Sequence, residues 1–392
     1  MRIVLIVIDS GGIGDAPDAE RFGDGGANTI THTAEAVGGV ALPHLAQMGL
    51  TRLTPVPGTD DEPLRGVAYP LIPLANGKDT LAGHWEMMGI TVTEPFRTFP
   101  KGFPHEVVEE LERRFGRPVL GNEVASGTEI IQRLGPEHMK TGNPIVYTSA
   151  DSVLQIAAHE EVVPVETLYR WCREARQVMQ GPYLVGRIIA RPFIGAPGHF
   201  VRTARRHDFS VEPPGPTVVD HLFRQGVETV AVGKIGDIFS GHGFSDHIPT
   251  QNNLDGLERT LFVLEKQAHH HQFIFTNLVD FDSQYGHRRN PAGYAEALRS
   301  LDRFLPRLWQ ELKADDQIWI TADHGCDPTY RGTDHTRERV PWLAWGPSLT
   351  PFVGAARQGL SDIGATLAAL FHVEPVGHGQ PAVELLTPST LR

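Results

Sequence analysis

Apolar and β-branched residues form four short continuous runs along the chain. The first is Ile3–Ile8, and the other three, Thr229–Val232, Phe273–Leu278 and Ile318–Thr321, lie nearer the C-terminus. Runs of this length and composition are typical of strands that are buried on both faces of a parallel sheet. A fifth apolar piece, Trp342–Trp345, is a further strand candidate.

Helical patterns alternate with these strands. Apolar residues recur at helical spacing in Leu254–Leu264, Ala292–Leu305 and Ile363–Phe371. Strands that alternate with amphipathic helices predict an α/β domain with a mainly parallel sheet and helices on both faces.

The middle of the chain has a different pattern. Glu106–Phe115 is an amphipathic helix candidate that stops at Gly116, and a second one spans Leu168–Met179. Two strand candidates, Ile145–Thr148 and Val185–Ile194, lie on either side of the second helix. This mixture predicts a smaller α+β module.

Segments rich in proline and glycine flank this module, one at 95–104 and one at 211–216. Such segments are typical of domain boundaries. We therefore predict a core domain of residues 1–96 and 214–392, into which a cap domain of residues 97–213 is inserted.

Composition limits the partners. The net charge is −12, from 35 basic and 47 acidic side chains, which argues against a nucleic acid or an anionic membrane. A small anionic substrate stays compatible, because a bound divalent metal reverses the local field. The two cysteines, Cys172 and Cys326, are too few for a disulfide framework. The His269–His271 run follows a helical pattern and is interpreted as a solvated helix end, not a metal site.

Compartment is predicted from what the chain does not contain. Met1 leads directly into the first strand candidate, and no apolar run approaches membrane-spanning length. We therefore expect a cytoplasmic protein.

Four segments place metal-ligand residue types at or near the ends of predicted strands, where open α/β sheets bind their ligands. Singly, each aspartate could be a cap or turn residue, but burial of so much unpaired charge is costly unless a metal is present. Three carboxylates and three imidazoles from this set suit Mn²⁺ or Zn²⁺. The segments contribute Asp9, then Asp280, Asp282 and His287, then Asp323 and His324, and finally Asp334 and His335.

A pair of metal ions about 4 Å apart typically clamps the attacking and leaving oxygens of a transferred phosphoryl or sulfuryl group. The best nucleophile candidate is Thr80, in the segment Lys78-Asp79-Thr80-Leu81. The residues after Thr80 suggest a helix N-terminus, where backbone N–H groups favour a phosphothreonine. The alternative is that Thr80 only caps this helix.

Several segments, spread over nearly the whole chain, resemble the phosphopentomutase family of the alkaline phosphatase superfamily. The Asp-His-Gly element at 323–325 marks only the superfamily, whereas the Lys-Asp-Thr and Asp-Phe-Asp elements are more specific to the mutases. The resemblance rests on the segments at 9–14, 78–87, 147–152, 186–193, 202–208, 232–235, 277–282, 285–289 and 321–328.

This resemblance implies an alkaline-phosphatase-like core with an inserted cap. It implies that one Mn²⁺ is held by Asp282, His287 and His335, that a second is held by Asp9, Asp323 and His324, and that Thr80 carries the phosphoryl group. The implied reaction, in nucleoside salvage, interconverts ribose 1-phosphate and ribose 5-phosphate, or the deoxyribose pair, through a 1,5-bisphosphate. A sugar bisphosphate activator is implied as well, and a monomer is plausible.

In the cap, the resemblance implies ribose contacts from Ser149 and Asp151. It also implies that Arg187, Arg206 and Lys234 bind the distal phosphate, for which arginine offers a bidentate fork. Arg202 fits the arginine-rich stretch as well as Arg206 does, so the choice between them stays open.

Other functions are less compatible with the sequence. A metal-dependent phosphatase of the same superfamily is the nearest alternative. A sulfatase would need Cys/Ser-x-Pro-x-Arg after the first strand, and cofactor-independent phosphoglycerate mutases use a serine nucleophile. Gly11-Gly12-x-Gly14 lacks the third glycine of a dinucleotide site, and Lys78 is not followed by the Ser or Thr of a P-loop. A non-catalytic metal-binding protein is the remaining alternative.

Overall fold

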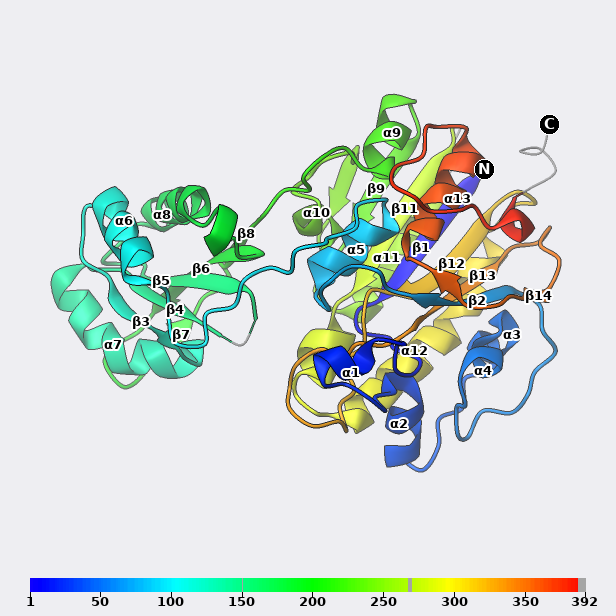
Figure 1. Ribbon diagram of the computed structural model, residues 1–392, viewed down its shortest axis with the longest axis horizontal. Coiled ribbons are helices and arrows are strands. Elements are labelled where there is room, and N and C mark those ends of the chain that lie inside the picture. The colour runs from blue at the N-terminus through cyan, green and yellow to red at the C-terminus, as the bar shows by residue number, and fades with distance from the viewer. Residues whose placement is uncertain (150, 267–269, 387–392) are drawn as a thin grey trace. The chain divides into compact units, whose positions relative to one another are not determined.

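The computed structural model describes residues 1–149, 151–266 and 270–386, so His269 lies outside the described residues. The chain divides into two compact units. Unit 1 comprises Met1–Glu94 and Pro213–Arg392, and unit 2 comprises Pro95–Glu212. In Figure 1 the blue and the red ends of the colour scale both lie in unit 1, so unit 2 is an insertion within it.

Unit 1 is built on a mixed sheet with the strand order β10-β9-β11-β1-β12-β13-β2-β14, and β15 also pairs with β2. The first five strands in this order are parallel, while β13 is antiparallel to both of its neighbours. The predicted α/β class with a mainly parallel sheet is therefore confirmed. The strands are β1 (Arg2–Ile8), β2 (Val67–Ile72), β9 (Glu228–Val232), β10 (Asp246–Ile248), β11 (Gln272–Leu278), β12 (Gln317–Ala322), β13 (Val340–Trp345), β14 (Phe352–Val353) and β15 (Arg357–Gln358).

The register of the three central strands positions the functional residues. Ile8, the last residue of β1, pairs with Leu278 at the end of β11 and with Ala322 at the end of β12. Parallel strands that end in register release their chains at the same edge. Asp9 and Asp323 therefore emerge side by side from the carboxyl edge of the sheet.

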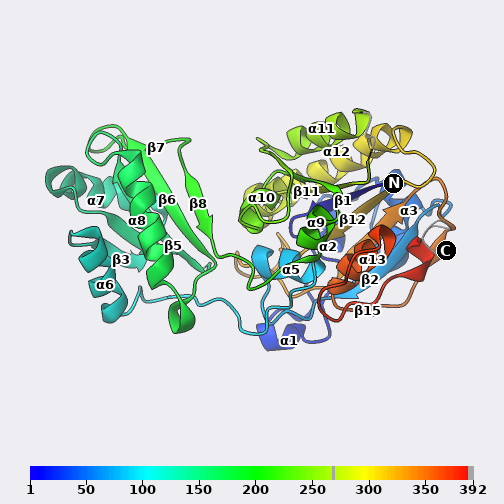
Figure 2. The same ribbon diagram turned by 90° about the horizontal axis from the view of Figure 1, so that it is seen from above.

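Helices cover both faces of this sheet. Figure 2 shows α11 and α12 on one side of the strands and α5, α9 and α13 on the other. Among the described helices, none combines the length and the apolar character that a membrane crossing requires. The helices of unit 1 are α1 (Ala19–Phe22), α2 (Thr29–Ala36), α3 (Pro43–Met48), α4 (Leu50–Leu53), α5 (Thr80–Met87), α9 (Val218–Arg224), α10 (Ile235–Ile238), α11 (Asn253–Glu265), α12 (Pro291–Gln310), α13 (Ser361–Phe371), the π-helical turn η2 (Phe281–Gly286) and the 3₁₀ turn η3 (Val383–Leu385).

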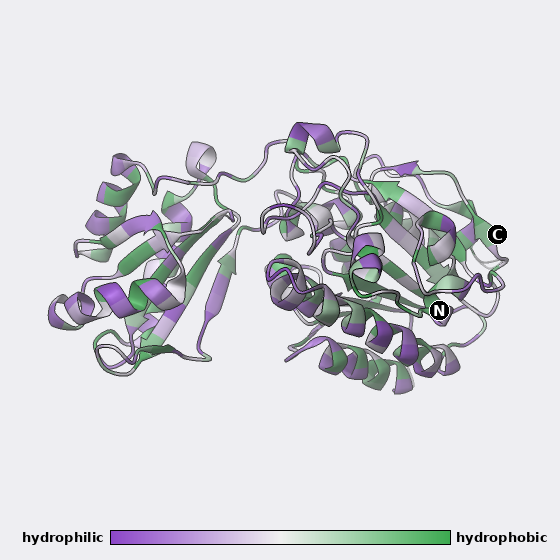
Figure 3. Ribbon diagram, turned by 90° about the horizontal axis from the view of Figure 1, so that it is seen from below, coloured by the Kyte–Doolittle hydropathy of each residue, from purple (hydrophilic) through white to green (hydrophobic). Residues whose placement is uncertain are grey.

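The helix α12 illustrates how local sequence and packing agree. Asn290 caps it by accepting a hydrogen bond from the Gly293 N–H, and Pro291 occupies its first turn, where no N–H is needed. Its apolar stripe, including Leu298 and Leu305, is fully buried in the core. Each such leucine contributes roughly 1.5–3 kcal/mol. Figure 3 shows the same pattern more widely, with green strands inside and helices banded green and purple.

Unit 2 has its own sheet, with the order β3-β4-β5-β6-β7 and β8 paired to β6. The strand predicted from Val185 begins at Arg187, and the strand β5 and the helix α7 were not predicted. The elements are β3 (Leu120–Val124), β4 (Ile145–Thr148), β5 (Val153–His159), β6 (Arg187–Ile194), β7 (Val201–Arg202), β8 (His207–Ser210), α6 (His105–Phe115), α7 (Gly127–Thr141), α8 (Val165–Val178) and the 3₁₀ turn η1 (Gly181–Tyr183).

Candidate metal centre

Six side chains from distant parts of the sequence meet at the carboxyl edge of the unit 1 sheet. Two follow β1 and β12 directly, two come from the η2 turn after β11 and its C-cap, one follows Asp323, and one lies in the loop between β12 and β13. All are buried except His287, which is half-buried. They are Asp9, Asp282, His287, Asp323, His324 and His335.

The six form two adjoining groups. In the first, His335 Nε2 lies 3.3 Å from Asp282 Oδ1 and 3.0 Å from His287 Nε2. In the second, His324 Nε2 lies 3.2 Å from Asp323 Oδ2 and 3.6 Å from Asp9 Oδ1. The groups adjoin because ligand atoms of Asp282, His324 and His335 all lie within 4.8 Å of one another.

Backbone carbonyls orient the imidazoles. His287 Nδ1 lies 2.6 Å from the Thr333 carbonyl oxygen, and His335 Nδ1 lies 2.6 Å from that of Lys78. A carbonyl oxygen only accepts, so both Nδ1 atoms carry the hydrogen and both Nε2 atoms face the cluster. Two nitrogen lone pairs 3.0 Å apart repel each other unless a cation, a proton or a metal ion, lies between them.

The carboxylates also indicate a site for a cation. Asp9 Oδ1, Asp282 Oδ1 and Asp323 Oδ2 are buried, and the described residues offer none of these oxygens a hydrogen bond. Burial and the neighbouring carboxylates of Asp323 and Asp282 raise the pKa of Asp9 well above its ordinary value. Bare buried carboxylate oxygens are costly, and divalent cations remove that cost. The donor set therefore fits a divalent metal that takes oxygen and nitrogen ligands.

The negative charge of these carboxylates changes the pKa values of the imidazoles. Burial by itself lowers the pKa of His324, but the negative charge of the Asp323 carboxylate outweighs it and raises the pKa to about 10. Burial acts against His287 in the same way, and the hydrogen bond with Asp282 raises its pKa to about 12. Both shifts show how strongly this cluster attracts positive charge.

A strained turn holds Asp9 and Asp323 in place. Ser10, the residue after Asp9, has φ 79°, a left-handed conformation that costs a non-glycine residue of order 1–3 kcal/mol. In this conformation its N–H donates to Asp323 Oδ1 over 3.0 Å. Asn277 Nδ2 in turn donates to Asp9 Oδ2 over 3.1 Å. The strain is thus coupled to the orientation of two carboxylates.

Thr80 lies beside the cluster and is not the cap of its helix. Asp79 caps α5, since its side chain accepts a hydrogen bond from the Ala82 N–H. The interpretation of Thr80 as a mere cap is therefore wrong. Thr80 is the first residue of α5, and its Oγ1 lies 3.4 Å from His324 Nε2.

Sequence reasoning missed three polar residues at this site. His84 lies one turn after Thr80, is fully buried, and places Nδ1 3.2 Å from Asp323 Oδ2. Its four-residue spacing from Thr80 on one helix could have revealed it. Asn277 is a polar residue inside a buried strand, which is a second readable signal. The third is Lys78, whose Nζ lies 2.9 Å from Asp24 Oδ2 and 3.2 Å from Asp334 Oδ2.

Two predicted ligand candidates have other partners. Asp280 Oδ2 accepts a hydrogen bond from the Asn253 N–H at the start of α11. Asp334 pairs with Lys78 as described above. Lys234, the N-cap position of α10, lies close enough to Asp9 that its charge lowers the pKa of that carboxyl, against the stronger effect of burial.

In unit 2 several predicted substrate contacts gather near the start of β6. Arg187 Nη2 lies 3.8 Å from Asp151 Oδ2, and Arg187 Nη1 lies 3.7 Å from Asp208 Oδ2. The Asp151 N–H donates to Ser149 Oγ over 3.3 Å. Arg206 also contacts Asp208, so this aspartate links the two arginines.

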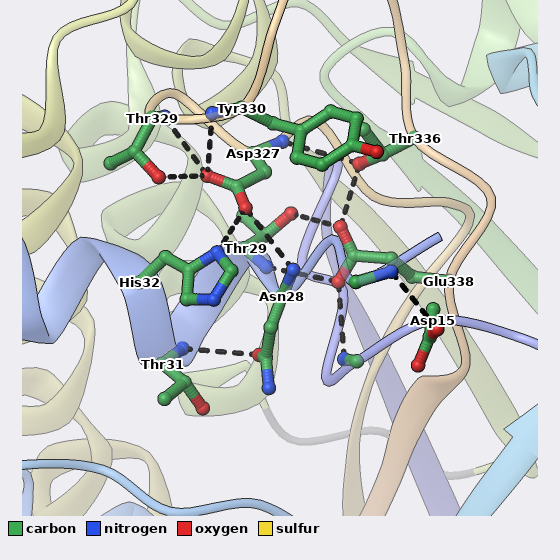
Figure 4. Close-up of polar contacts among 12 residues, drawn as sticks. Asp15, Asn28, Thr29, Thr31, His32, Asp327, Thr329, Tyr330, Thr336 and Glu338 are labelled. Atoms are coloured by element: carbon green, nitrogen blue, oxygen red, sulfur yellow. Dashed lines mark hydrogen bonds and ion pairs between the residues drawn. The ribbon is translucent and has the colours of Figure 1, made fainter. Parts of the chain in front are cut away.

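A second buried carboxylate, Glu338, joins the loops that carry the ligands. Figure 4 shows it at the centre of a polar network. Its oxygens accept hydrogen bonds from the Thr29 N–H, the Thr29 hydroxyl, the Thr336 hydroxyl and the Gly14 N–H, at 2.9, 2.6, 2.6 and 3.2 Å. Both glycines beside it are required, because a Cβ at Gly12 or at Gly325 would lie 2.1 or 2.2 Å from its carboxylate.

The two hydroxyls extend this network to the ligands. The Cys326 N–H donates to Thr29 Oγ1, and the Asp327 N–H donates to Thr336 Oγ1. Thr336 directly follows His335, and Cys326 lies two residues after His324. Glu338 therefore connects the chain after Asp9 with the chain segments that bear His324 and His335.

Comparison with known proteins agrees with this geometry. The chain matches the metalloenzyme superfamily over residues 1–375. A phosphopentomutase of Caldanaerobacter subterraneus subsp. tengcongensis is 52% identical over 380 residues, which cover 96% of each chain. A phosphopentomutase of Thermotoga petrophila is 51% identical over 383 residues, which cover 97% of this chain and 98% of that one.

Similarity to solved structures is weaker. The phosphoglycerate mutase of Leishmania mexicana is 14% identical, with a TM-score of 0.45 and 97% of each chain covered, and nothing is concluded from it. The superfamily match and the two relatives, each about half identical over almost the entire length, are decisive by themselves. They show that the chain belongs to the phosphopentomutase family of the metalloenzyme superfamily and is an isomerase.

Proposed function

We propose that this isomerase interconverts ribose 1-phosphate and ribose 5-phosphate, and the deoxyribose pair, with Thr80 as the carrier of the phosphoryl group. The observation that supports this most is the position of Thr80 Oγ1, 3.4 Å from His324 Nε2 at the edge of the carboxylate and imidazole cluster. Because Asp79 caps the helix, the Thr80 hydroxyl has no capping role to give up.

The cluster would hold two Mn²⁺ ions. Asp282, His287 and His335 would bind one, and Asp9, Asp323 and His324 would bind the other. Bound in this way, the ions would lower the pKa of a reacting hydroxyl and neutralise charge on the transferred phosphoryl group. The three buried oxygens without a hydrogen-bond donor support this assignment.

The residues around Thr80 suit a phosphorylated side chain. Thr80 is the first residue of α5, so its side chain lies at the positive end of the helix dipole. This position favours an anionic phosphothreonine over the neutral hydroxyl.

The reaction then needs two transfers. In the first, the O–P bond at Thr80 breaks while a new O–P bond forms to the free hydroxyl of the sugar phosphate, which loses its proton. The product is a 1,5-bisphosphate, and Thr80 regains a free hydroxyl. In the second, the other phosphoryl group of the bisphosphate moves to Thr80, which leaves the isomeric monophosphate. A sugar bisphosphate activator would phosphorylate Thr80 at the start.

Unit 2 would supply the substrate contacts. Ser149 and Asp151 would bind the ribose, and Arg187 would bind the distal phosphate. Asp208 already engages the Arg206 fork through two hydrogen bonds of 2.7 Å. Because the Arg206 guanidinium is already paired with Asp208, Arg202 is the stronger candidate for the distal phosphate.

Arg202 has different surroundings. A Cβ at Gly127 would lie 2.3 Å from both Arg202 Nη2 and the Tyr147 hydroxyl, so the guanidinium and this hydroxyl share one small space. The Tyr147 hydroxyl is buried and has no hydrogen-bond partner among the described residues. We therefore expect Arg202→Ala to raise KM for ribose 5-phosphate by at least about 10-fold, and more than Arg206→Ala does. Equal effects of the two variants would remove this distinction.

Thr80→Ala tests the main proposal. The purified wild-type enzyme, incubated with Mn²⁺ and ³²P-labelled glucose 1,6-bisphosphate, should acquire label on the peptide around Thr80. The variant should acquire none and should lose mutase activity, with unchanged metal content. Thr80→Ser, which keeps a hydroxyl, is the matched control and should retain labelling. Isomerisation by Thr80→Ala at a near-normal rate would exclude Thr80 as the carrier.

A product assay distinguishes a mutase from a phosphatase on this core. With ribose 5-phosphate as substrate, formation of ribose 1-phosphate marks phosphoryl transfer between hydroxyls. Release of inorganic phosphate in its place would mark hydrolysis and would overturn the proposed reaction while leaving the metal centre in place.

A further inference from the structure

The side chain of Cys326 lies next to two of the proposed metal ligands. Cys326 follows Gly325 in the loop after β12 and is almost fully buried. Ligand atoms of Cys326, Asp282 and His287 all lie within 4.8 Å of one another. A carboxylate, an imidazole and a sulfur at this spacing form a set that differs in kind from the oxygen and nitrogen ligands elsewhere in the centre.

The backbone is shaped to bring this sulfur close. Gly286, the last residue of η2, directly precedes His287, and a Cβ at Gly286 would lie only 2.8 Å from Cys326 Sγ. Any larger residue would displace the sulfur. The Sγ also lies 3.7 Å from the Asp334 carbonyl oxygen.

Asp282 and His287 are thus shared by two ligand sets. With His335 they form a set of oxygen and nitrogen donors, since His335 Nε2 lies 3.3 Å from Asp282 Oδ1. With Cys326 they form a set that contains sulfur. Mn²⁺ prefers the first set, whereas Zn²⁺ and Cd²⁺ gain from a thiolate ligand. The buried Asp282 Oδ1, which accepts no hydrogen bond from a described residue, is available to either set.

We propose that Cys326 is a ligand for thiophilic divalent cations, Zn²⁺ or Cd²⁺, which it binds together with Asp282 and His287 in competition with Mn²⁺. This inference rests on the proposed metal-binding role of Asp282 and His287. When the cation binds, a metal–sulfur bond forms, and the Cys326 S–H proton is released to solvent together with any proton on His287 Nε2, because a metal ligand must be deprotonated. No oxidant or further reactant is needed.

The enzyme should therefore be sensitive to Zn²⁺ and Cd²⁺ at one of its two metal sites. A cation that takes the sulfur set withdraws Asp282 and His287 from the set that contains His335. Zn²⁺ or Cd²⁺ would then displace Mn²⁺ from one of its two sites only, because Asp9, Asp323 and His324 are not shared with Cys326.

Titration of the metal-depleted full-length protein with Cd²⁺ tests the proposal, because a cadmium–thiolate bond has a charge-transfer absorption in the ultraviolet. The two cysteines of the chain provide a matched pair of variants. Cys172 is fully buried in α8 of unit 2 and belongs to none of the candidate metal clusters among the described residues. Wild type and Cys172→Ser should both develop the band, which saturates at one Cd²⁺ per chain, and Cys326→Ser should not.

Affinity gives a second measurement. The Cd²⁺ dissociation constant of Cys326→Ser should rise by about 10-fold or more, since even partners outside the ligand shell typically cost that much. Asp282→Asn, which keeps both cysteines, should weaken the band as well, so the conclusion does not depend on the folding of a single variant. An unchanged band in Cys326→Ser, or no band in wild type, would overturn the proposal. If that wild-type preparation still isomerises ribose 5-phosphate with Mn²⁺, the inference about Cys326 fails while the proposed function stands.

Discussion

Unit 1 contains two groups of buried carboxylates at or beside the proposed metal centre, and they differ in one respect. Asp9, Asp282 and Asp323 (the bare group) each have a buried oxygen without a hydrogen-bond donor among the described residues. Asp327 and Glu338 (the bonded group) are equally buried, yet their oxygens accept hydrogen bonds from backbone N–H groups and threonine hydroxyls.

The comparison shows how the fold distinguishes carboxylates that stabilise loops from carboxylates that are available to bind a metal. Carboxylates of the bonded group are satisfied by the protein itself, so they stabilise the loops around them. Carboxylates of the bare group are held in place, but each has an oxygen without a hydrogen-bond donor among the described residues. A bound cation offsets the cost of burying that charge. In the absence of metal, loss of the Asp9 charge and loss of a charge from the bonded group should therefore have opposite effects on stability.

The largest effect is expected for Asp9→Asn. Asparagine keeps an oxygen that can accept the Asn277 Nδ2–H but removes one charge from the crowded bare group. Mutase activity should fall by about 1,000-fold or more, since loss of a charged metal ligand costs several kcal/mol of transition-state stabilisation. Without metal, the variant should be more stable than wild type by about 1 kcal/mol, because burial and the carboxylates of Asp323 and Asp282 raise the pKa of Asp9 and so disfavour its charged form.

Urea unfolding with and without Mn²⁺ measures both parts. Mn²⁺ at 100 times its dissociation constant should stabilise wild type by about 2.7 kcal/mol and should stabilise Asp9→Asn much less. If the metal-free variant is less stable than wild type, Asp9 belongs with the bonded group and the contrast is wrong.

Glu338→Gln should have the next largest effect, and of the opposite sign in the absence of metal. The glutamine amide would turn an N–H donor toward the Thr29 and Thr336 hydroxyls, whose oxygens already accept backbone N–H groups, at a cost of about 2–3 kcal/mol. The loss should be present with and without Mn²⁺. Because Glu338 ties together the segments that bear the ligands, the half-saturating Mn²⁺ concentration should also rise by about 10-fold.

The control for this variant is Glu258→Gln, on the exposed surface of α11. It should change neither stability nor Mn²⁺ dependence. A Glu338→Gln protein that unfolds like wild type would show that the network in Figure 4 contributes little to the fold.

The smallest effect is expected for Asp327→Asn, and it should depend on pH. Burial raises the pKa of Asp327, but hydrogen bonds from the Thr329 hydroxyl and N–H outweigh it and hold the pKa below its ordinary value. A depressed pKa stabilises the folded state above the unfolded pKa of about 4, and this stabilisation is lost as the pH falls through the folded value. The variant should therefore lose about 1–2 kcal/mol at neutral pH and progressively less in acid.

Asp315→Asn, at an exposed position before β12, is the matched control and should show little difference at any pH. Free energies of unfolding from urea titrations between neutral and acidic pH check the prediction. A difference between Asp327→Asn and wild type that grows toward low pH would contradict it.

Much of the fold was readable because its signals are local. The β-branched runs at Ile3–Ile8 and Phe273–Leu278 became β1 and β11, and the apolar stripe near Leu298 became α12. The same holds for residue type: aspartates and histidines placed just after buried strands predict a metal-binding edge. Covalent adjacency and side-chain periodicity need no knowledge of distant contacts.

Other features could not be read in this way. The β5 strand lacks a continuous β-branched run, because Gln155 interrupts it and it ends in two alanines and His159, and α7 contains Gly135 and Pro136. His84 and Asn277 resemble ordinary helix and strand residues until packing brings them beside Asp323 and Asp9. The sequence does not identify the helix cap either. Asp79 and Thr80 are both good cap residues, and only the folded turn shows that Asp79 is used.

The sequence by itself determined which residues are able to bind a cation and which strands deliver them, since both follow from the chemistry of neighbouring residues. Only the tertiary structure decided that Ile8, Leu278 and Ala322 end in register, that Glu338 is satisfied while Asp9 is not, and that the Cys326 sulfur lies beside His287. The physical reason is that hydrogen-bond satisfaction depends on which distant segments pack together, and that packing is settled by the whole core at once.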